Sequence, residues 1–240
     1  VEHVLAALPV YMTPDDHEYT DNHPNEAPTL KTGLPQLSHH ELNATLVATQ
    51  AHRAFQQLQN VRRPRLAYGF SAGPLRTCVI DTRTERRRSP YPGPLHGIFS
   101  PRTKRAVQRW LFHPRAAQAL NVIATGSVAL PGQHPEFDPA NPSDPDSLSW
   151  SPGDRQWLLD TLAQATTRHS GMRFLLISGD YHVSAMAGIE LDGRTVGAAI
   201  VVPPLYSPMP FMDTVPQALW WDKELEVDLG ASRRGRFTLR

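Results

Sequence analysis

The sequence predicts a mixed α/β or α+β fold, and three observations support this prediction. Strand-like apolar runs and helix-like segments are mixed along the 240 residues without a regular alternation. Two segments begin at a proline and continue with helical spacing. Residues 172–178 form a nearly continuous apolar run, as expected for a central strand that is buried on both faces. The length suits one large domain or two small ones.

The first half of the chain contains three predicted elements. Residues 10–13 resemble a buried strand that enters a polar turn. Ser38 followed by Glu41 is a capping-box signal, and the apolar spacing after it predicts a helix over residues 39–60. The apolar residues of 76–82 predict a second strand.

The second half contains two helices, the central strand and a hairpin. Pro101 opens a helix that ends by Pro114, and Pro152 opens another that ends near Gly171. Asp192 and Gly193 predict a hairpin turn after residue 191. Residues 132–150 are acidic and rich in proline, without a hydrophobic period, which predicts a long surface loop.

Composition excludes several classes of protein. Lys and Arg number 24 against 23 Asp and Glu, and the net charge of +1 excludes a whole-protein electrostatic commitment to nucleic acid or anionic membrane. No apolar run reaches the roughly 18 residues of a membrane-spanning helix. Cys78 is the single cysteine, so an internal disulfide and a cysteine-rich zinc site are excluded. Charge is nevertheless segregated, with basic residues concentrated between Arg62 and Arg115 and acidic residues before position 45.

The first candidate site lies in residues 13–23 (TPDDHEYTDNH), directly after the first predicted strand. Asp15, Asp16 and His17 offer oxygen ligands for a hard metal ion and an imidazole for proton transfer. An acidic, solvated turn is the alternative interpretation, because Asp and Asn are also favoured in turns.

The second candidate site is residues 178–184 (SGDYHVS), at the end of the central strand. Asp180 and His182 are two residues apart, so in extended backbone they project to one side. Ligand crevices open at strand ends in α/β sheets. A Gly-Asp turn with an incidental histidine is the alternative. Together, the two Asp/His clusters suggest one metal site assembled from both.

The third candidate is the arginine-rich segment 81–88 (DTRTERRR). Arg83 and Arg86 follow a predicted strand, and guanidinium groups match phosphate oxygens in a bidentate geometry. A solvated basic face is the alternative interpretation.

Two further motifs are expected to carry no chemistry. Ser71 lies in a G-x-S-x-G pattern (GFSAG), but a strand-like segment follows it instead of the helix that a nucleophile elbow requires. Cys78 has apolar neighbours, so we expect a buried structural cysteine.

These motifs together resemble one family. PDDHE followed by an Asn, then IDTRTER, then DRQWLLDTL and finally LISGDYHVS occur in the order and approximate spacing found in the PhoD-like alkaline phosphatases, which belong to the calcineurin-like metallophosphoesterases. The resemblance covers residues 8–202. It implies a four-layer αββα sandwich, of which residues 1–240 would form a single partial domain that is incomplete at its N-terminus.

The resemblance also implies site residues and cofactors. Asp16, Asp180 and His182 would bind metal, with Asp15 as the alternative to Asp16. His17 would act at the transition state, and Arg83 and Arg86 would contact phosphate. The complete domain would hold two divalent or trivalent metal ions, with Fe, Ca, Mn or Zn as candidates.

The implied activity is hydrolysis of a small phosphate monoester or diester by a metal-bound hydroxide. Metal-binding segments that the family carries upstream of the PDDHE motif, including Gly-Asp-x-x-Tyr, do not occur in the chain, and the sequence leaves open whether they exist before Val1. A catalytically silent fragment and a polyanion-binding module using the Arg62–Arg115 region are the alternatives. Nucleic acid is expected only as a diester substrate. The family is often exported, but the chain shows no signal peptide, so no compartment is predicted.

Overall fold

The computed structural model describes residues 67–86, 97–130, 147–179, 184–203 and 224–240, together with positions 13, 50, 53 and 54. Within these residues the strands form one eight-stranded sheet in the order β1-β2-β3-β4-β6-β5-β8-β7. The strands are β1 (Ala67–Ala72), β2 (Leu75–Ile80), β3 (Leu120–Thr125), β4 (Arg173–Ser178), β5 (Ala185–Leu191), β6 (Arg194–Val201), β7 (Glu224–Gly230) and β8 (Arg233–Leu239). The helical elements are α3 (Pro101–Leu111), η1 (Pro114–Gln118), η2 (Leu148–Trp150) and α4 (Pro152–Arg168).

Four neighbouring strands, β2, β3, β4 and β6, run parallel. Their last residues, Ile80, Thr125, Ser178 and Val201, are aligned in register across the sheet. The remaining strands pair antiparallel, with β1 beside β2 and with β5, β8 and β7 on the other side of β6. The carboxyl ends of the parallel strands therefore form one continuous edge, where α/β sheets open their ligand crevices.

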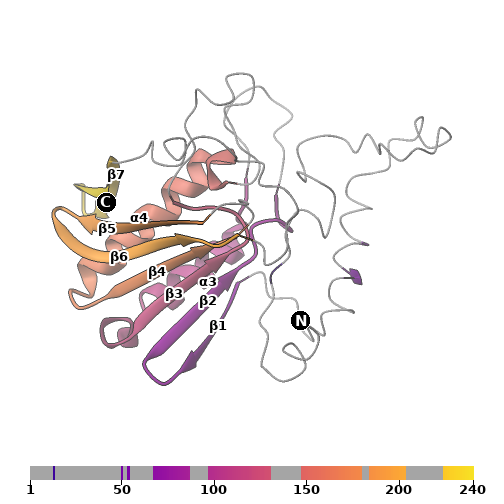
Figure 1. The fold of residues 1–240 in the computed structure, drawn as a ribbon, viewed down its shortest axis with the longest axis horizontal. Helices are drawn as coiled ribbons and strands as arrows, with labels where there is room; N and C mark the ends of the chain where they lie inside the picture. The colour runs from indigo at the N-terminus through magenta and orange to yellow at the C-terminus, as the bar shows by residue number, and fades with distance from the viewer. Residues whose placement is uncertain are drawn as a thin grey trace.

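The helices α3 and α4 cover the same face of the sheet (Figure 1). Alternate residues of a strand point to one face, and Phe174 and Leu176 of β4 are buried in the same cluster as Leu158 and Leu162 of α4. Burial of each such side chain stabilises the fold by about 1.5–3 kcal/mol. The hydrophobic core thus lies between this sheet face and the two helices, and it packs against the strands that end at the carboxyl edge.

The helix α4 also protects the outer strand β7. Gln156 Nε2 donates to the carbonyl of Glu226 at 2.8 Å, and the backbone N–H of Asp228 donates to Asp160 Oδ1 at 2.8 Å. An edge strand has one row of backbone groups that no neighbouring strand satisfies. Among the described residues β7 has no strand on its outer side, and side chains of α4 satisfy its backbone at these two positions.

Several sequence predictions are confirmed. The central strand is β4, and the two proline-initiated helices are α3 and α4. Ser100 caps α3, because its hydroxyl accepts the Thr103 N–H at 3.2 Å. The hairpin turn between β5 and β6 contains Asp192 at φ 50° and Gly193 at φ 78°, the left-handed backbone that Asp and Gly tolerate. The mixed α/β class is also confirmed.

Other parts differ from the sequence prediction. The sequence did not predict β1, β3, β7 or β8. Leu148 and Trp150 were expected in a surface loop. They are instead buried in the core just before α4, because these two side chains at the end of the acidic segment are large and apolar. Residues 131–146, the predicted strand before Thr13, and the predicted helix 39–60 apart from three positions lie outside the described residues. In the part of the chain that the structure describes, no helix has the length and apolar character needed to cross a membrane.

Candidate functional site

The candidate metal ligands lie outside the described residues. This applies to Asp15, Asp16, Asp180 and His182, and also to His17, the candidate transition-state residue. Within the described part, no three His, Cys, Asp or Glu side chains gather into a possible metal site. Gly179, directly before Asp180, is the last described residue of its segment, and the structure shows where this segment leaves the sheet.

Gly179 lies at the carboxyl edge of the parallel strands. Its N–H donates to the carbonyl of Thr125, the last residue of β3, at 3.3 Å. The N–H of Val202 donates to the carbonyl of Ser178 at 2.8 Å on the other side. The segment that leads to Asp180 and His182 thus leaves the sheet from a backbone that both neighbouring strands hold.

The turn after β2, residues 81–86, leaves the same edge and is called the arginine turn below. The Asp81 carboxylate accepts the N–H of Arg83 at 2.9 Å, the N–H of Thr84 at 2.8 Å and the Thr84 hydroxyl. The turn closes with a hydrogen bond from Arg86 N–H to the Arg83 carbonyl at 3.2 Å. An Asp side chain that accepts the next backbone N–H groups fixes a tight turn, so Asp81 orients Arg83 through its backbone.

Both arginines of this turn are buried, which contradicts the solvated basic face considered above. Arg83 is 0% exposed and Arg86 is 6% exposed. Arg86 Nε donates to the Thr82 carbonyl at 2.7 Å, its Nη2 donates to Ser127 Oγ at 2.7 Å, and its guanidinium lies 5.1 Å from the Trp150 ring centroid. These contacts attach Arg86 to the segments that follow β2 and β3 and to Trp150, which belongs to the hydrophobic core.

A group of buried hydroxyls at this edge was missed in the sequence. Thr82, Thr125, Ser127 and Ser178 are all buried and hydrogen-bonded to one another or to nearby backbone. The available signal was the TGS triplet directly after an apolar run at residues 120–124 and the Ser before Gly179. Because the sequence did not predict β3, which lies between β2 and β4, nothing in the sequence indicated that these hydroxyls lie close together.

Two carboxylates fix the chain next to the arginine turn. Glu85 Oε2 accepts the Ser100 N–H at 2.8 Å and the Thr103 hydroxyl at 2.7 Å, which joins the turn to the start of α3. Asp154, in the first turn of α4, accepts the N–H groups of Ile98 and Phe99. The segment before α3 is therefore held from both sides.

The two motifs expected to carry no chemistry are described by the structure. Ser71 lies in β1, opposite Arg76 in an antiparallel hairpin, and no helix follows it. Cys78 is buried in β2, and burial raises the pKa of its thiol to about 12, so it remains protonated near neutral pH. Neither residue is in a position to act as a nucleophile.

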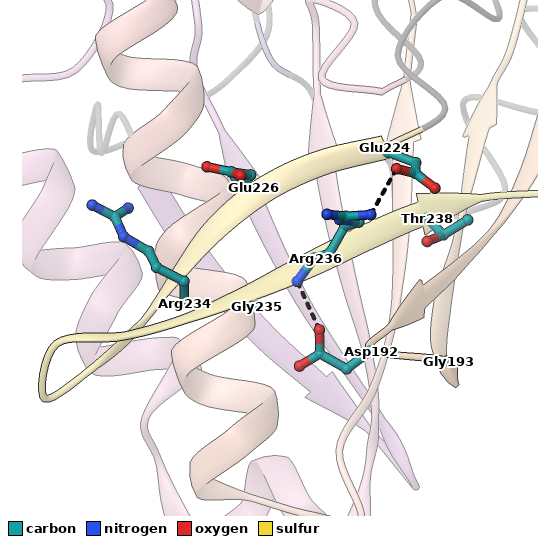
Figure 2. A pocket seen from close by; sticks show the side chains of 8 residues that line it. All are labelled: Asp192, Gly193, Glu224, Glu226, Arg234, Gly235, Arg236 and Thr238. Carbon is teal, nitrogen blue, oxygen red and sulfur yellow. Dashed lines mark hydrogen bonds and ion pairs between the residues drawn. The ribbon is translucent and has the colours of Figure 1, made fainter.

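A pocket of about 450 Å³ lies between the β5–β6 turn and the β7–β8 hairpin. Figure 2 shows Arg236 between Glu224 and Asp192, to which it donates from Nη1 and from its backbone N–H, at 2.9 Å and 2.8 Å. Because Asp192 and Gly193 precede β6, the pocket lies at the amino ends of the parallel strands. It is separate from the carboxyl edge that carries the candidate site.

The chain was compared with known families and structures. A family model described as PhoD-like phosphatase matches residues 1–228. A solved structure described as that of PhoD matches with a TM-score of 0.54 and 18% identity, over 80% of this chain and 39% of that chain. This likeness shows a shared fold, and the chain spans about two fifths of the length of that structure. A comparison with curated proteins gave no match. The family model covers nearly the whole chain, and the chain therefore belongs to the PhoD-like phosphatase family.

Proposed function

We propose that this chain supplies part of the active site of a metal-dependent phosphoesterase that hydrolyses a small phosphate monoester or diester. One observation carries the proposal: the arginine turn and the segment that begins at Gly179 leave the sheet at the same carboxyl edge. Basic groups for a phosphate and the proposed ligands Asp180 and His182 thus start from the ends of β2 and β4, which lie on either side of β3. Membership of a phosphatase family agrees with this arrangement.

The proposed donors fit a metal ion of this chemistry. Asp16, or Asp15 in its place, and Asp180 offer carboxylate oxygens, and His182 offers an imidazole nitrogen. Mixed oxygen and nitrogen donors suit Fe, Mn and Zn, whereas Ca prefers oxygen alone. When bound, metal ions supply Lewis acidity that offsets charge on phosphoryl oxygens and makes water nucleophilic near neutral pH.

The remaining residues have roles that follow from their charge and position. His17 stabilises or protonates the leaving oxygen as the ester bond breaks. Arg83 and Arg86 contribute positive charge where negative charge develops on the phosphoryl group. Because both guanidinium groups are buried, their field acts in a low-dielectric environment, where it is stronger than at a solvated surface. The contacts of Arg86 with Ser127 and Thr82 also hold the arginine turn in place.

The test is hydrolysis of an aryl phosphate monoester and a diester, with added divalent metal, by the protein and by its Asp180→Asn and His182→Ala variants. Both variants are expected to lose most of their activity and to bind metal more weakly in calorimetric titration. Asp192→Asn is the matched control, because Asp192 occupies the β5–β6 turn at the opposite edge of the sheet. It should retain the activity of the parent protein.

The outcomes separate the proposal from its main alternative. Unchanged turnover in both site variants would remove Asp180 and His182 from the site. A parent protein that neither hydrolyses an ester nor binds metal would identify the chain as a catalytically silent relative.

Polyanion binding is the second candidate function, and an exposed face of α3 favours it. Arg102, Arg105 and Arg109 are exposed and lie on one side of this helix, which contains no acidic residue. Two of the arginines on which the alternative rested, Arg83 and Arg86, are buried, which weakens it. Retention on a heparin column that falls steeply with salt and needs no metal would favour polyanion binding over phosphoester hydrolysis.

A further inference from the structure

The buried hydroxyls at the carboxyl edge form a continuous link across three strands. On one side, Ser178 ends β4 and leads into Gly179. On the other, Thr82 is the second residue of the arginine turn after β2. The strand between them, β3, contributes Thr125 and, two residues later, Ser127. All four side chains are buried, so their hydrogen bonds form without competition from bulk water.

The link from β4 to β3 has a defined direction. Thr125 Oγ1 donates its proton to the Ser127 carbonyl at 2.8 Å. A hydroxyl has one proton, so at its 3.1 Å contact with Ser178 Oγ the Thr125 oxygen is the acceptor. Ser178 Oγ in turn lies 3.4 Å from the donating N–H of Ala129. Thr125 thus connects the last residue of β4 to the backbone of Ser127.

The link from β3 to the arginine turn is reciprocal. Ser127 N–H donates to Thr82 Oγ1 at 3.1 Å, and the Thr82 hydroxyl donates to Ser127 Oγ at 3.0 Å. The same Ser127 oxygen accepts Arg86 Nη2 at 2.7 Å. A charged donor makes a stronger hydrogen bond than a neutral one, so Ser127 is the main attachment of Arg86 to β3.

We propose that Thr125 and Ser127 are positioning residues that hold the arginine turn in register with the segment beginning at Gly179. The proposal rests on the proposed function, because it concerns the distance between the basic groups of that site and its ligands Asp180 and His182. The two segments come from β2 and β4, which do not pair with each other, so β3 alone connects them within the sheet. A displacement of about 1 Å between reacting groups can cost about 100-fold in rate, which explains why such a link matters.

The experiment removes one hydroxyl and keeps the volume. Thr125→Val deletes the proton that binds the Ser127 carbonyl, whereas Thr125→Ser keeps the hydroxyl and serves as the rescue variant. Thr166→Val is the matched control, because Thr166 is also buried and its hydroxyl also donates to a carbonyl, that of Leu162 at 2.7 Å, but within α4. Hydrogen exchange by mass spectrometry and steady-state kinetics are measured on the metal-loaded protein.

In Thr125→Val, we expect backbone amides in both 82–86 and 177–179 to exchange about 10-fold faster, and kcat/KM for the aryl phosphate to fall about 10-fold. Thr125→Ser should restore both values to within about twofold of the parent. Thr166→Val should change exchange only in α4 and leave kcat/KM at the parent value.

Two results would overturn the inference: exchange in Thr125→Val that stays unchanged at residues 82–86, or a kcat/KM equal to that of Thr166→Val. If the parent protein hydrolyses neither ester, the proposed function fails. The hydrogen-exchange result alone then decides whether the two segments are coupled.

Discussion

Asp154 offers the sharpest test of how the structure is held together beside the candidate site. Its side chain is buried in the first turn of α4, and Oδ2 accepts the N–H groups of Ile98 and, at 3.0 Å, Phe99. Oδ1 pairs with Lys104, whose side chain is 30% exposed. One carboxylate therefore attaches the segment before α3 to the start of α4.

The magnitude follows from these contacts. Asp154→Ala leaves two buried backbone N–H groups without an acceptor, at a cost of about 1–3 kcal/mol each. The ion pair with Lys104 is partly exposed, and solvent screening limits its contribution to below about 1 kcal/mol. The expected loss in the free energy of unfolding is about 3–5 kcal/mol. Asp154→Asn keeps one acceptor oxygen, so it should lose only about 1–2 kcal/mol.

The assay is urea unfolding followed by circular dichroism, at matched protein concentration. Glu226→Ala is the control, because this side chain is exposed and only its backbone carbonyl takes part in a described hydrogen bond. Its free energy of unfolding should stay within about 0.5 kcal/mol of the parent value. A loss below about 1 kcal/mol for Asp154→Ala would refute the reasoning, since the two N–H groups would then have found other partners.

Three further predictions follow from close contacts and burial. Gly197→Ala should reduce soluble yield severely, because a Cβ there would lie 2.2 Å from the Phe174 carbonyl oxygen. Gly153→Ala is the matched control: an added Cβ there meets open space, so this variant should raise the thermal midpoint slightly. Burial raises the pKa of Cys78 from 9.0 to about 12, so the folded state keeps a proton that the unfolded state loses, and stability should fall between these pH values. Replacement by Ala should remove this component of the pH dependence in urea titrations. Arg86→Lys should cost about 2 kcal/mol in thermal unfolding, because an ammonium cannot satisfy Ser127 and the Thr82 carbonyl together; an unchanged midpoint would show that it can.

The sequence was most informative where local signals decide the structure. Pro101 and Pro152 mark helix starts because their fixed φ suits the first turn of a helix and their missing N–H costs nothing there. Asp192 and Gly193 mark the hairpin because they tolerate positive φ. The strand β4 was visible because its apolar run ends abruptly at Gly179.

Strands that depend on pairing were not visible. The sequence of β7 (ELEVDLG) is acidic and that of β8 (RRGRFTL) is basic, and each becomes a strand through antiparallel pairing with the other. A short apolar run such as that of β3 cannot be distinguished from a buried helix segment by periodicity. Tertiary pairing supplies the information that these segments lack.

The same limit applied to the candidate site. The position of Arg83 and Arg86 at a strand end was predictable, but their burial was not, because an arginine run usually indicates a solvated face. Ser127, the partner that holds Arg86, is 41 residues away in the sequence. Ser127 reaches Arg86 only because β2 pairs in parallel with β3, and no local sequence pattern predicts this pairing.

The attachment of α4 to β7 has a consequence for how molecules of this protein meet one another. An exposed outer strand is a template onto which a second chain can add its own strand, and edge-to-edge growth of this kind leads to aggregates. Gln156 and Asp160 occupy the carbonyl of Glu226 and the N–H of Asp228, and carboxylates alternate along the same strand. A second chain would have to displace both side chains and approach those charges, so we expect this edge of the described sheet to resist self-association.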